Sequence, residues 1–420
     1  MTRTPTFALS LLFAVSCGSN GGSAGTGQPD AKAPDGAAPD AMHDAMHAVD
    51  AQGNPDSMGS CNDCEVTNLT IQNMYVHSGT GCEVDQTEVQ AISFQAGASH
   101  VTVDNVTIHD VGWAISSNAS FTTIGPNVEI YDIDHGFIFG TANGTTIGNI
   151  VFHDNHVHDY ANWDTTAATD CYHHDGIHGF GGTSGVVTDF TAYNNLFDGE
   201  TGDNFNEHIF LEGTNDGTPW TTSPSSTSHI FNNVFSVTTS SIGIAGMGPV
   251  GGNGVWANNT LTGFSPSYVS SCEGFGNTST LSSGAIVENN AVQNCGVLIG
   301  GSETGPGETG TFTVKTFDYN AYASCNHTYN CFFITLATAI DTSDFATWQS
   351  MSGYDAHSIA NLASSMYFAL DSTFHPMTGS PLLGKGDNLT SLCTGSLTPL
   401  CADKSGKARP KTGAWNIGAY

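Results

Sequence analysis

Short runs of β-branched and aromatic residues alternate with Asn, Gly and Asp from about residue 64 onward, without a sustained 3.6-residue period. One four-residue pattern recurs about every 30 residues, a spacing typical of solenoid proteins. In this pattern a polar turn residue precedes alternating apolar positions. The pattern begins at Asn73, Asn105, Asn127, Asp154, Asn194, Asn232, Asn258, Asn289 and Tyr319.

Stacking these repeats would create two rows of equivalent side chains, because every second residue of a strand faces the same way. The first row is apolar and comprises Val76, Ile108, Ile130, Val157, Phe197, Phe235, Leu261, Val292 and Tyr322. The row two positions earlier ends in successive asparagines: Asn155, Asn195, Asn233, Asn259, Asn290 and Asn320. Asparagines stacked about 4.8 Å apart can hydrogen-bond from one coil to the next, whereas the core of a β-sandwich offers them no such partners. The rows therefore predict an all-β chain wound as a parallel β-helix.

Such asparagine ladders resemble those of the pectate-lyase-like β-helix superfamily, over residues 64–335. The resemblance implies a right-handed, single-stranded solenoid. The closing sequences Ser380-Pro-Leu-Leu-Gly-Lys-Gly386 and Trp415-Asn-Ile-Gly-Ala-Tyr420 are similar to the C-terminal segments of bacterial surface β-helix proteins. We expect this segment to cap the open end of the coils, whose exposed strand edge would otherwise pair with other chains.

Four segments follow from these patterns. Residues 1–17 resemble a bacterial lipoprotein signal, with Arg3, a short apolar stretch and Cys17 as the expected lipidation site. Residues 18–60 are rich in Gly, Ala, Pro and Asp and predict a disordered tether. Residues 61–375 form the predicted β-helix and residues 376–420 the cap. An exported, membrane-anchored protein on the cell surface or outside the cell is expected, held at the outer membrane by its lipid.

The net charge and the cysteine content restrict the possible partners and the cellular compartment. The formal net charge is −31, and residues 33–314 contain no Lys or Arg, so a nucleic-acid partner is not expected. Setting Cys17 aside leaves ten of the 11 cysteines, an even number that suits disulfides in an oxidising compartment. The pairing of these cysteines does not follow from the sequence. We expect the protein to be a monomer.

The densest polar cluster lies on two neighbouring repeats, 171–180 and 203–212. His174-Asp175-Gly-Ile-His178 resembles His-x-Asp-Gly-Ile stretches of carbohydrate-active β-helix enzymes, which implies that Asp175 is a catalytic carboxylate. The candidate catalytic residues are Asp175, His178, Glu207, His208 and Glu212. Two registers stay open: Phe210 or Glu212 can lie beside His178.

Long loops beside this cluster carry aromatic residues that suit stacking on sugar rings. The candidate substrate-binding residues are Trp163, Tyr172, His174, Asp203 and Trp220. We expect a polysaccharide as substrate or ligand.

Three functions remain open. Hydrolysis of a neutral glycan needs only two carboxyl groups and no cofactor. A polysaccharide lyase would need bound Ca²⁺ to replace the missing Arg and Lys, and Asp- and Asn-rich turns suit that ion. Stacked coils could instead bring three histidines of a local excess to one transition metal ion. The excess comprises His153, His156, His158, His173, His174, His178 and His208. Against this metal site, His77, His109, Tyr131 and His158 fall in one outward column, which is typical of a stacked surface row. A non-catalytic adhesin or carbohydrate-binding protein is the third alternative.

Overall fold

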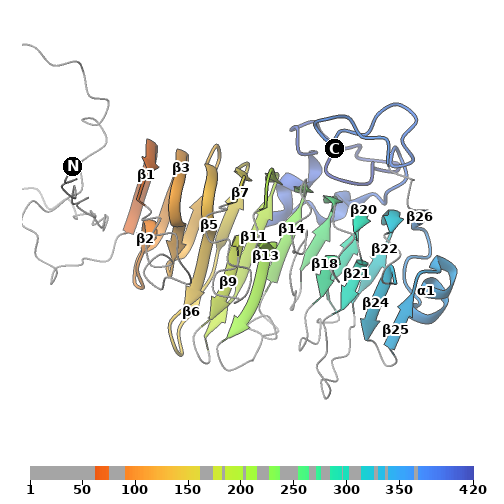
Figure 1. Ribbon diagram of the computed structural model, residues 1–420, viewed down its shortest axis with the longest axis horizontal. Coiled ribbons are helices and arrows are strands. Elements are labelled where there is room, and N and C mark those ends of the chain that lie inside the picture. Colours follow the sequence, from red (N-terminus) through yellow and green to blue (C-terminus); the bar gives the residue numbers. More distant parts are fainter. Residues whose placement is uncertain are drawn as a thin grey trace, which may run out of the picture.

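The structure is a computed structural model that describes residues 62–74, 90–160, 174–181, 185–201, 205–214, 227–236, 254–263, 271–275, 284–295, 297–301, 314–325, 330–335, 339–363 and 368–420. The fold is predominantly β, and its strands stack side by side in parallel ladders along one long axis (Figure 1). Within the described residues, no helix is long and apolar enough to cross a membrane.

Successive coils add strands to shared parallel ladders. The first ladder comprises β4 (Ser120–Ile124), β7 (Ile150–His153), β11 (Asp189–Tyr193), β14 (Thr227–Phe231), β16 (Val255–Ala257), β19 (Ile286–Glu288) and β22 (Thr316–Asp318). The second comprises β8 (His156–His158), β12 (Leu196–Asp198), β15 (Val234–Ser236), β17 (Thr260–Thr262), β20 (Ala291–Cys295), β23 (Ala321–Cys325) and β26 (Ile359–Asn361).

A third ladder carries the candidate site. It contains β2 (Gln90–Phe94), β9 (His174–Gly181) and β13 (Phe205–Thr214). Farther along the chain, β18 (Ser271–Phe275), β21 (Val297–Gly301), β24 (Phe332–Thr335) and the antiparallel β25 (Ala339–Thr342) form a separate four-stranded sheet. Long strands run through more than one ladder: β1 (Asn62–Gln72), β3 (Ser99–Ser117) and β5 (Glu129–Thr141). The short strands β6 (Thr146–Ile147) and β10 (Val186–Val187) pair separately.

The strand register confirms the predicted apolar row from Ile108 to Tyr322. Each member pairs with the next, from Ile108 with Ile130 to Val292 with Tyr322, and all are fully buried. Aromatic members also stack, as Phe197 does on Phe235 with ring centroids 5.1 Å apart. Such pairs add about 0.5–1.5 kcal/mol beyond their buried area.

Buried asparagines follow one another beside this row. The side-chain N–H of Asn195 donates to Oδ1 of Asn233 (2.9 Å), and Asn233 donates in the same way to Asn259 (3.1 Å). The succession continues to Asn290 (3.0 Å) and Asn320 (3.3 Å). These amides therefore satisfy one another inside the coil, where an unpaired amide would be costly.

The residue before each of these asparagines makes the corner. Asn194, Asn232, Asn258 and Asn289 have φ between 55° and 61°. Asn tolerates this left-handed conformation better than other residues with a side chain, which explains the recurring Asn-Asn pair.

The predicted register of the first coil is wrong by five residues. Ile108 pairs with Ile71, not with Val76, and Asn68 lies beside Asn105. Asn73 lies at a second corner of the coil, next to Asp110. The N–H of Met74 donates to the backbone oxygen of Asp110, and Asn73 and Asp110 both have positive φ. Asn and Asp at both corners of a coil make the two corners hard to tell apart in the sequence.

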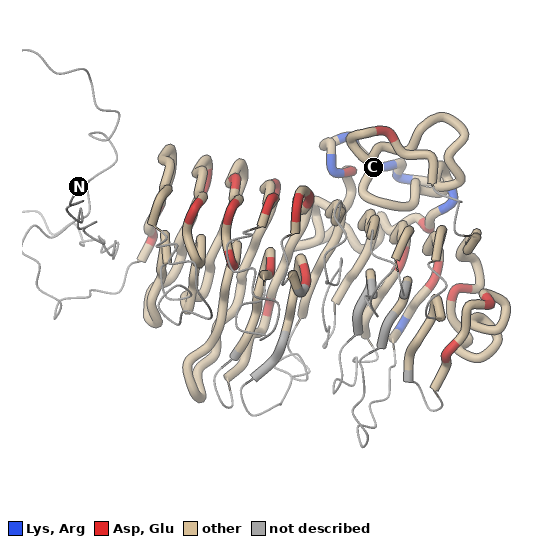
Figure 2. The backbone as a smooth tube through the Cα atoms, in the orientation of Figure 1, with Lys and Arg blue, Asp and Glu red and all other residues tan. Residues whose placement is uncertain are grey.

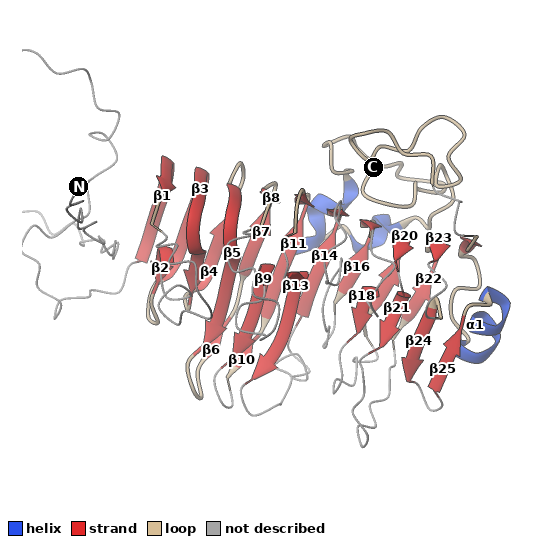
Figure 3. Ribbon diagram, viewed as in Figure 1, coloured by secondary structure: helices blue, strands red, loops and turns tan. Residues whose placement is uncertain are grey.

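The last coil is covered by helix α1 (Phe345–Ser352) rather than by the C-terminal segment (Figure 3). Asp344 caps the helix, since its carboxylate accepts from the N–H of Thr347 (2.7 Å), and Gly353 ends it in the left-handed conformation. The buried Trp348 stacks on Phe332 of the last coil at 5.1 Å.

The C-terminal segment packs along the side of the coils, over the corners formed by Asn232, Asn258 and Asn289. It contains the 3₁₀ helices η2 (Leu389–Leu392) and η3 (Gly395–Cys401). Arg409 donates to Oδ1 of Asn232 (2.9 Å). Figure 2 shows that Lys and Arg gather in this segment, while acidic residues recur along the coils.

All cysteines in the described part of the chain are disulfide-bonded. The pairs are Cys272–Cys295, Cys325–Cys331 and Cys393–Cys401, and Cys64 is also bonded. The expected disulfide chemistry is therefore present.

Candidate functional site

The predicted polar cluster lies on three neighbouring strands, β5, β9 and β13. His135 pairs with Asp175, and Asp175 pairs with Glu207. Farther along, His178 pairs with Phe210. Of the two registers left open by the sequence, the structure has the one that places Phe210 beside His178.

Glycines at the centre of these strands are required by close packing. A Cβ on Gly136 would lie 2.4 Å from the backbone oxygen of Gly176. A Cβ on Gly176 would lie 2.7 Å from the hydroxyl of Tyr160 and 2.9 Å from the ring of Phe197. The Gly after His135 and the Gly after Asp175 therefore let the strands approach the core and present the two polar residues side by side.

Asp175 is the centre of a buried network. Its Oδ2 lies 3.4 Å from Nε2 of His135 and 3.4 Å from Nδ1 of His178. The rings of His135 and His178 stack at 5.4 Å. Oδ1 of Asp175 accepts a hydrogen bond from the backbone N–H of Glu207 (3.1 Å).

A second carboxylate, Asp134, supports the histidines from behind. Nδ1 of His135 lies 2.8 Å from one of its oxygens, and Nδ1 of His174 lies 3.1 Å from the other. His174 was predicted to bind substrate, but it is 1% exposed and contacts Asp134. The structure therefore gives His174 a supporting position within the cluster.

Burial and charge act in opposite directions on the pKa values of His135 and Asp134. Burial would lower the pKa of His135, but the carboxylates of Asp134 and Asp175 outweigh it and raise that pKa to about 10. Burial would likewise raise the pKa of Asp134, but His135 and His174 hold it well below its ordinary value. At neutral pH the cluster thus contains an imidazolium between carboxylates.

For Glu207, in contrast, burial and charge shift the pKa in the same direction. Burial, and then the charge of Asp175, raise its pKa well above the ordinary value. Its Oε2 is buried and has no hydrogen-bond partner among the described residues. Burial and the charge of Asp175 therefore both favour the protonated form of Glu207.

His208 differs from the expectation that it would join the catalytic group. Its ring packs against both Phe197 and Phe235, and its Nδ1 lies 3.0 Å from the hydroxyl of Tyr160. Burial lowers its pKa to about 3, so the ring is neutral. His208 therefore faces the core, where its ring is fully buried, rather than the cluster around Asp175.

Several predicted residues fall outside the described part of the molecule. These are Trp163, Tyr172, Asp203, Trp220 and the lipidation site Cys17. Glu212 belongs to β13, at a register shift between Leu211 and Gly213, but its side chain is outside the described set.

Asp134 and His135 also belong to the cluster, although the polar stretches at 171–180 and 203–212 do not include them. They directly precede the apolar run Gly136-Phe-Ile-Phe139, which is typical of a core strand. The signal was available in the sequence. The strand register aligns the positions of Asp134-His135-Gly136-Phe137 with those of His174-Asp175-Gly176-Ile177, and both stretches contain a His and an Asp before the Gly.

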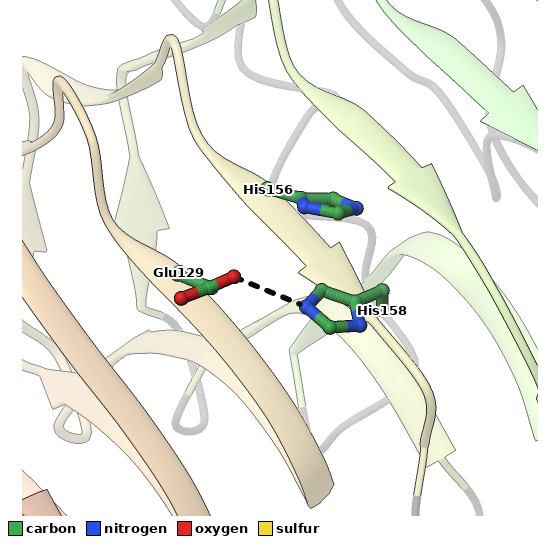
Figure 4. A group of neighbouring side chains, drawn as sticks. All are labelled: Glu129, His156 and His158. Carbon is green, nitrogen blue, oxygen red and sulfur yellow. Dashed lines mark ion pairs between the residues drawn. The ribbon is translucent and has the colours of Figure 1, made fainter.

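Two groups in the described residues have the composition of a metal site, and each contains two histidines and one carboxylate. In the first, which we call the inner triad, the ligand atoms of His135, Asp175 and His178 lie within 4.8 Å of one another. In the second, the outer triad, the same holds for Glu129, His156 and His158 (Figure 4). The inner triad is buried, whereas the outer triad is partly exposed.

These sets suit Zn²⁺ or another divalent transition metal rather than Ca²⁺, which prefers oxygen ligands. In the inner triad, however, the raised pKa of His135 keeps a proton on a nitrogen that a metal would need. The inner triad therefore favours proton chemistry, and the outer triad is the better metal candidate.

No model of a known protein family matches this chain, and no curated protein matches it in sequence.

Proposed function

We propose that this protein is a glycan-active hydrolase in which Asp175 and Glu207 are the two catalytic carboxyl groups. The observation that carries the proposal is their pairing on adjacent coils in opposite environments. Two neighbouring titratable groups whose surroundings favour different protonation states are typical of acid–base catalysis.

Each residue then has a distinct role. Protonated Glu207 donates its proton to the glycosidic oxygen of the leaving sugar. Asp175 faces the imidazolium of His135 and the N–H of Glu207, both of which favour its ionised form, so it serves as the nucleophile. Water, activated by the now deprotonated Glu207, then releases the sugar from Asp175. Neighbouring coils lie about 4.8 Å apart, and retaining enzymes place their carboxyls about 5 Å apart. Retention of anomeric configuration is the expected outcome.

A Ca²⁺-dependent polysaccharide lyase is the second candidate. His135 supplies a cation in a region without Lys or Arg, and a cation can neutralise a substrate carboxylate. A non-catalytic carbohydrate-binding protein is the third candidate, and it would need none of the protonation differences described above.

Product release from a panel of neutral and acidic polysaccharides, with and without Ca²⁺, distinguishes the three. The hydrolase yields new reducing ends without an ultraviolet-absorbing unsaturated product, and Asp175→Asn and Glu207→Gln each abolish the release. Glu129→Gln is the matched control, since it makes the same change on the neighbouring strand β5 and should leave activity intact. Unsaturated products would establish the lyase, and binding without product would establish the third candidate.

The setting of the enzyme belongs to the same proposal. We infer a right-handed β-helix that is exported, lipidated at Cys17 and carried on a tether at the outer membrane. The disulfides support an oxidising compartment. Metabolic labelling with a radiolabelled fatty acid, lost in Cys17→Ser, tests the anchor.

A further inference from the structure

Strand register brings the outer triad together on the outside of the second ladder. Glu129 on β5 pairs with His156 on β8, and His158 lies two residues farther along the same strand. Residues two apart in a strand face the same side. Figure 4 shows the three side chains on one side of β5 and β8, with Nε2 of His158 3.6 Å from Oε1 of Glu129.

Each of the two histidines contacts a supporting carboxylate through the ring nitrogen that faces away from the triad. Nδ1 of His158 lies 2.7 Å from Oδ2 of Asp159. Nε2 of His156 lies 2.7 Å from Oδ1 of Asp198, on the next coil. A carboxylate can only accept, so in the neutral rings the protons sit on these nitrogens. The lone pairs then lie on Nε2 of His158 and Nδ1 of His156.

The remaining nitrogens are available. Nε2 of His158 is buried and has no hydrogen bond among the described residues. Metal-bound histidines nearly always donate their second N–H to a carboxylate or carbonyl, which fixes the ring and raises its basicity. The outer triad thus has both its ligands and the supporting carboxylates of a metal site.

Access and charge also suit a cation. The side chains of Glu129 and His156 are 49% and 38% exposed, so an ion can enter from solvent. The pair Asp159 and Asp198 adds negative charge beside the three ligands. A tetrahedral site with bonds of about 2.0–2.1 Å brings ligand atoms to about 3.3 Å. Atoms that already lie within 4.8 Å reach this spacing by small side-chain rotations.

We propose that Glu129, His156 and His158 bind one divalent transition metal ion, with Zn²⁺ the best match, and that a solvent molecule completes the tetrahedron. Two imidazoles and a carboxylate with an open position are a common zinc ligand set. The site lies on a ladder different from that of Asp175 and Glu207, and it does not depend on their activity.

Titration of the metal-free full chain with ZnCl₂, followed by calorimetry and by competition with a chromophoric chelator, tests the proposal. One Zn²⁺ per chain should bind at the outer triad. Loss of a supporting carboxylate costs about 10–100-fold in affinity, so Asp198→Asn should weaken binding by that factor and Glu129→Gln or His156→Ala by at least about 100-fold. Circular dichroism checks that each variant is folded.

Two controls separate this site from other histidines. His109→Ala removes a ring that stacks on Tyr131, whose ring in turn stacks on His158; because His109 is not one of the three ligands, the Kd should stay unchanged. His178→Gln removes a member of the inner triad and should also leave it unchanged. The visible spectrum of bound Co²⁺ should show the intense bands of a tetrahedral site, lost in Glu129→Gln. Unchanged binding in Glu129→Gln and His156→Ala, or no binding by the wild type at millimolar Zn²⁺, would overturn the proposal.

Discussion

The inner and outer triads have the same composition but different surroundings. Both contain two histidines and one carboxylate, and both use strand β5. The inner triad is buried and holds an imidazolium between Asp134 and Asp175. The outer triad is partly exposed, and each of its histidines contacts a carboxylate through the nitrogen that faces away from the triad. Burial therefore turns one set into a charge-balanced proton network and leaves the other free for a metal ion.

The largest effect should come from Asp134→Asn, which leaves the imidazolium of His135 buried with one carboxylate fewer. Removing one partner of a buried ion pair costs about 3–5 kcal/mol. Urea unfolding should show that loss. Asp159→Asn makes the same change beside the outer triad, where solvent reaches the side chain, and a cost of about 1 kcal/mol or less is expected. Equal costs would mean that burial does not distinguish the two triads.

The second prediction concerns pH. The pKa of His135 is raised from 6.5 to about 10, so the folded state keeps a proton that the unfolded chain loses. Its stabilisation is complete below pH 6.5 and is lost as the pH rises toward 10, by up to about 1.4 kcal/mol per pH unit. The raised pKa of Glu207 acts in the same direction above its ordinary value.

Urea unfolding at a series of pH values above 6.5 measures this slope. His135→Gln should reduce it, leaving the part that Glu207 contributes. His156→Gln, in the outer triad, should keep the slope because water screens the charges there. A slope as steep in His135→Gln as in the wild type would place the proton uptake elsewhere.

The third prediction sharpens the metal side of the comparison. Zn²⁺ at about 100 times its Kd should stabilise the folded chain by about 2.7 kcal/mol. Thermal unfolding should show this gain in the wild type and in Asp175→Asn, whose outer triad is intact, but not in Glu129→Gln. A gain that is lost in Asp175→Asn but kept in Glu129→Gln would place the metal at the inner triad instead.

The smallest effect is expected for Glu129→Gln without metal. Glu129 is half-exposed, and substitutions at such surface positions change stability by about 0.5 kcal/mol or less. Urea unfolding in the presence of a chelator measures it. A large loss would show that Glu129 has a structural role and would disqualify it as a control.

Much of the fold could be predicted because the stack repeats the same chemistry at each coil. The apolar row from Ile108 to Tyr322 follows from alternation alone, and the structure has it in that register. The first coil failed because Asn68 and Asn73 both occupy left-handed corners, and only the pairing with Asn105 tells them apart. The position of the C-terminal segment depends on contacts such as Arg409 with Asn232, which no local pattern encodes.

The candidate site was predicted in part for similar reasons. Asp175, His178 and Glu207 stand out in dense polar stretches, and the stack brings them together. The inward position of His208 depends on its contacts with Phe197, Phe235 and Tyr160, which come from other parts of the chain. Asp134 and His135 were overlooked because an apolar run follows them directly in the sequence.

The most direct test of the central claim is the protonation of the two carboxyl groups at neutral pH. Infrared spectra of the wild type, compared with Glu207→Gln and Asp175→Asn, can assign the carboxylic-acid band and the carboxylate bands. The proposed mechanism predicts a buried carboxylic acid that disappears in Glu207→Gln, and a carboxylate that disappears in Asp175→Asn. If Glu207 is ionised at neutral pH, it has no proton to donate and the proposed mechanism is contradicted.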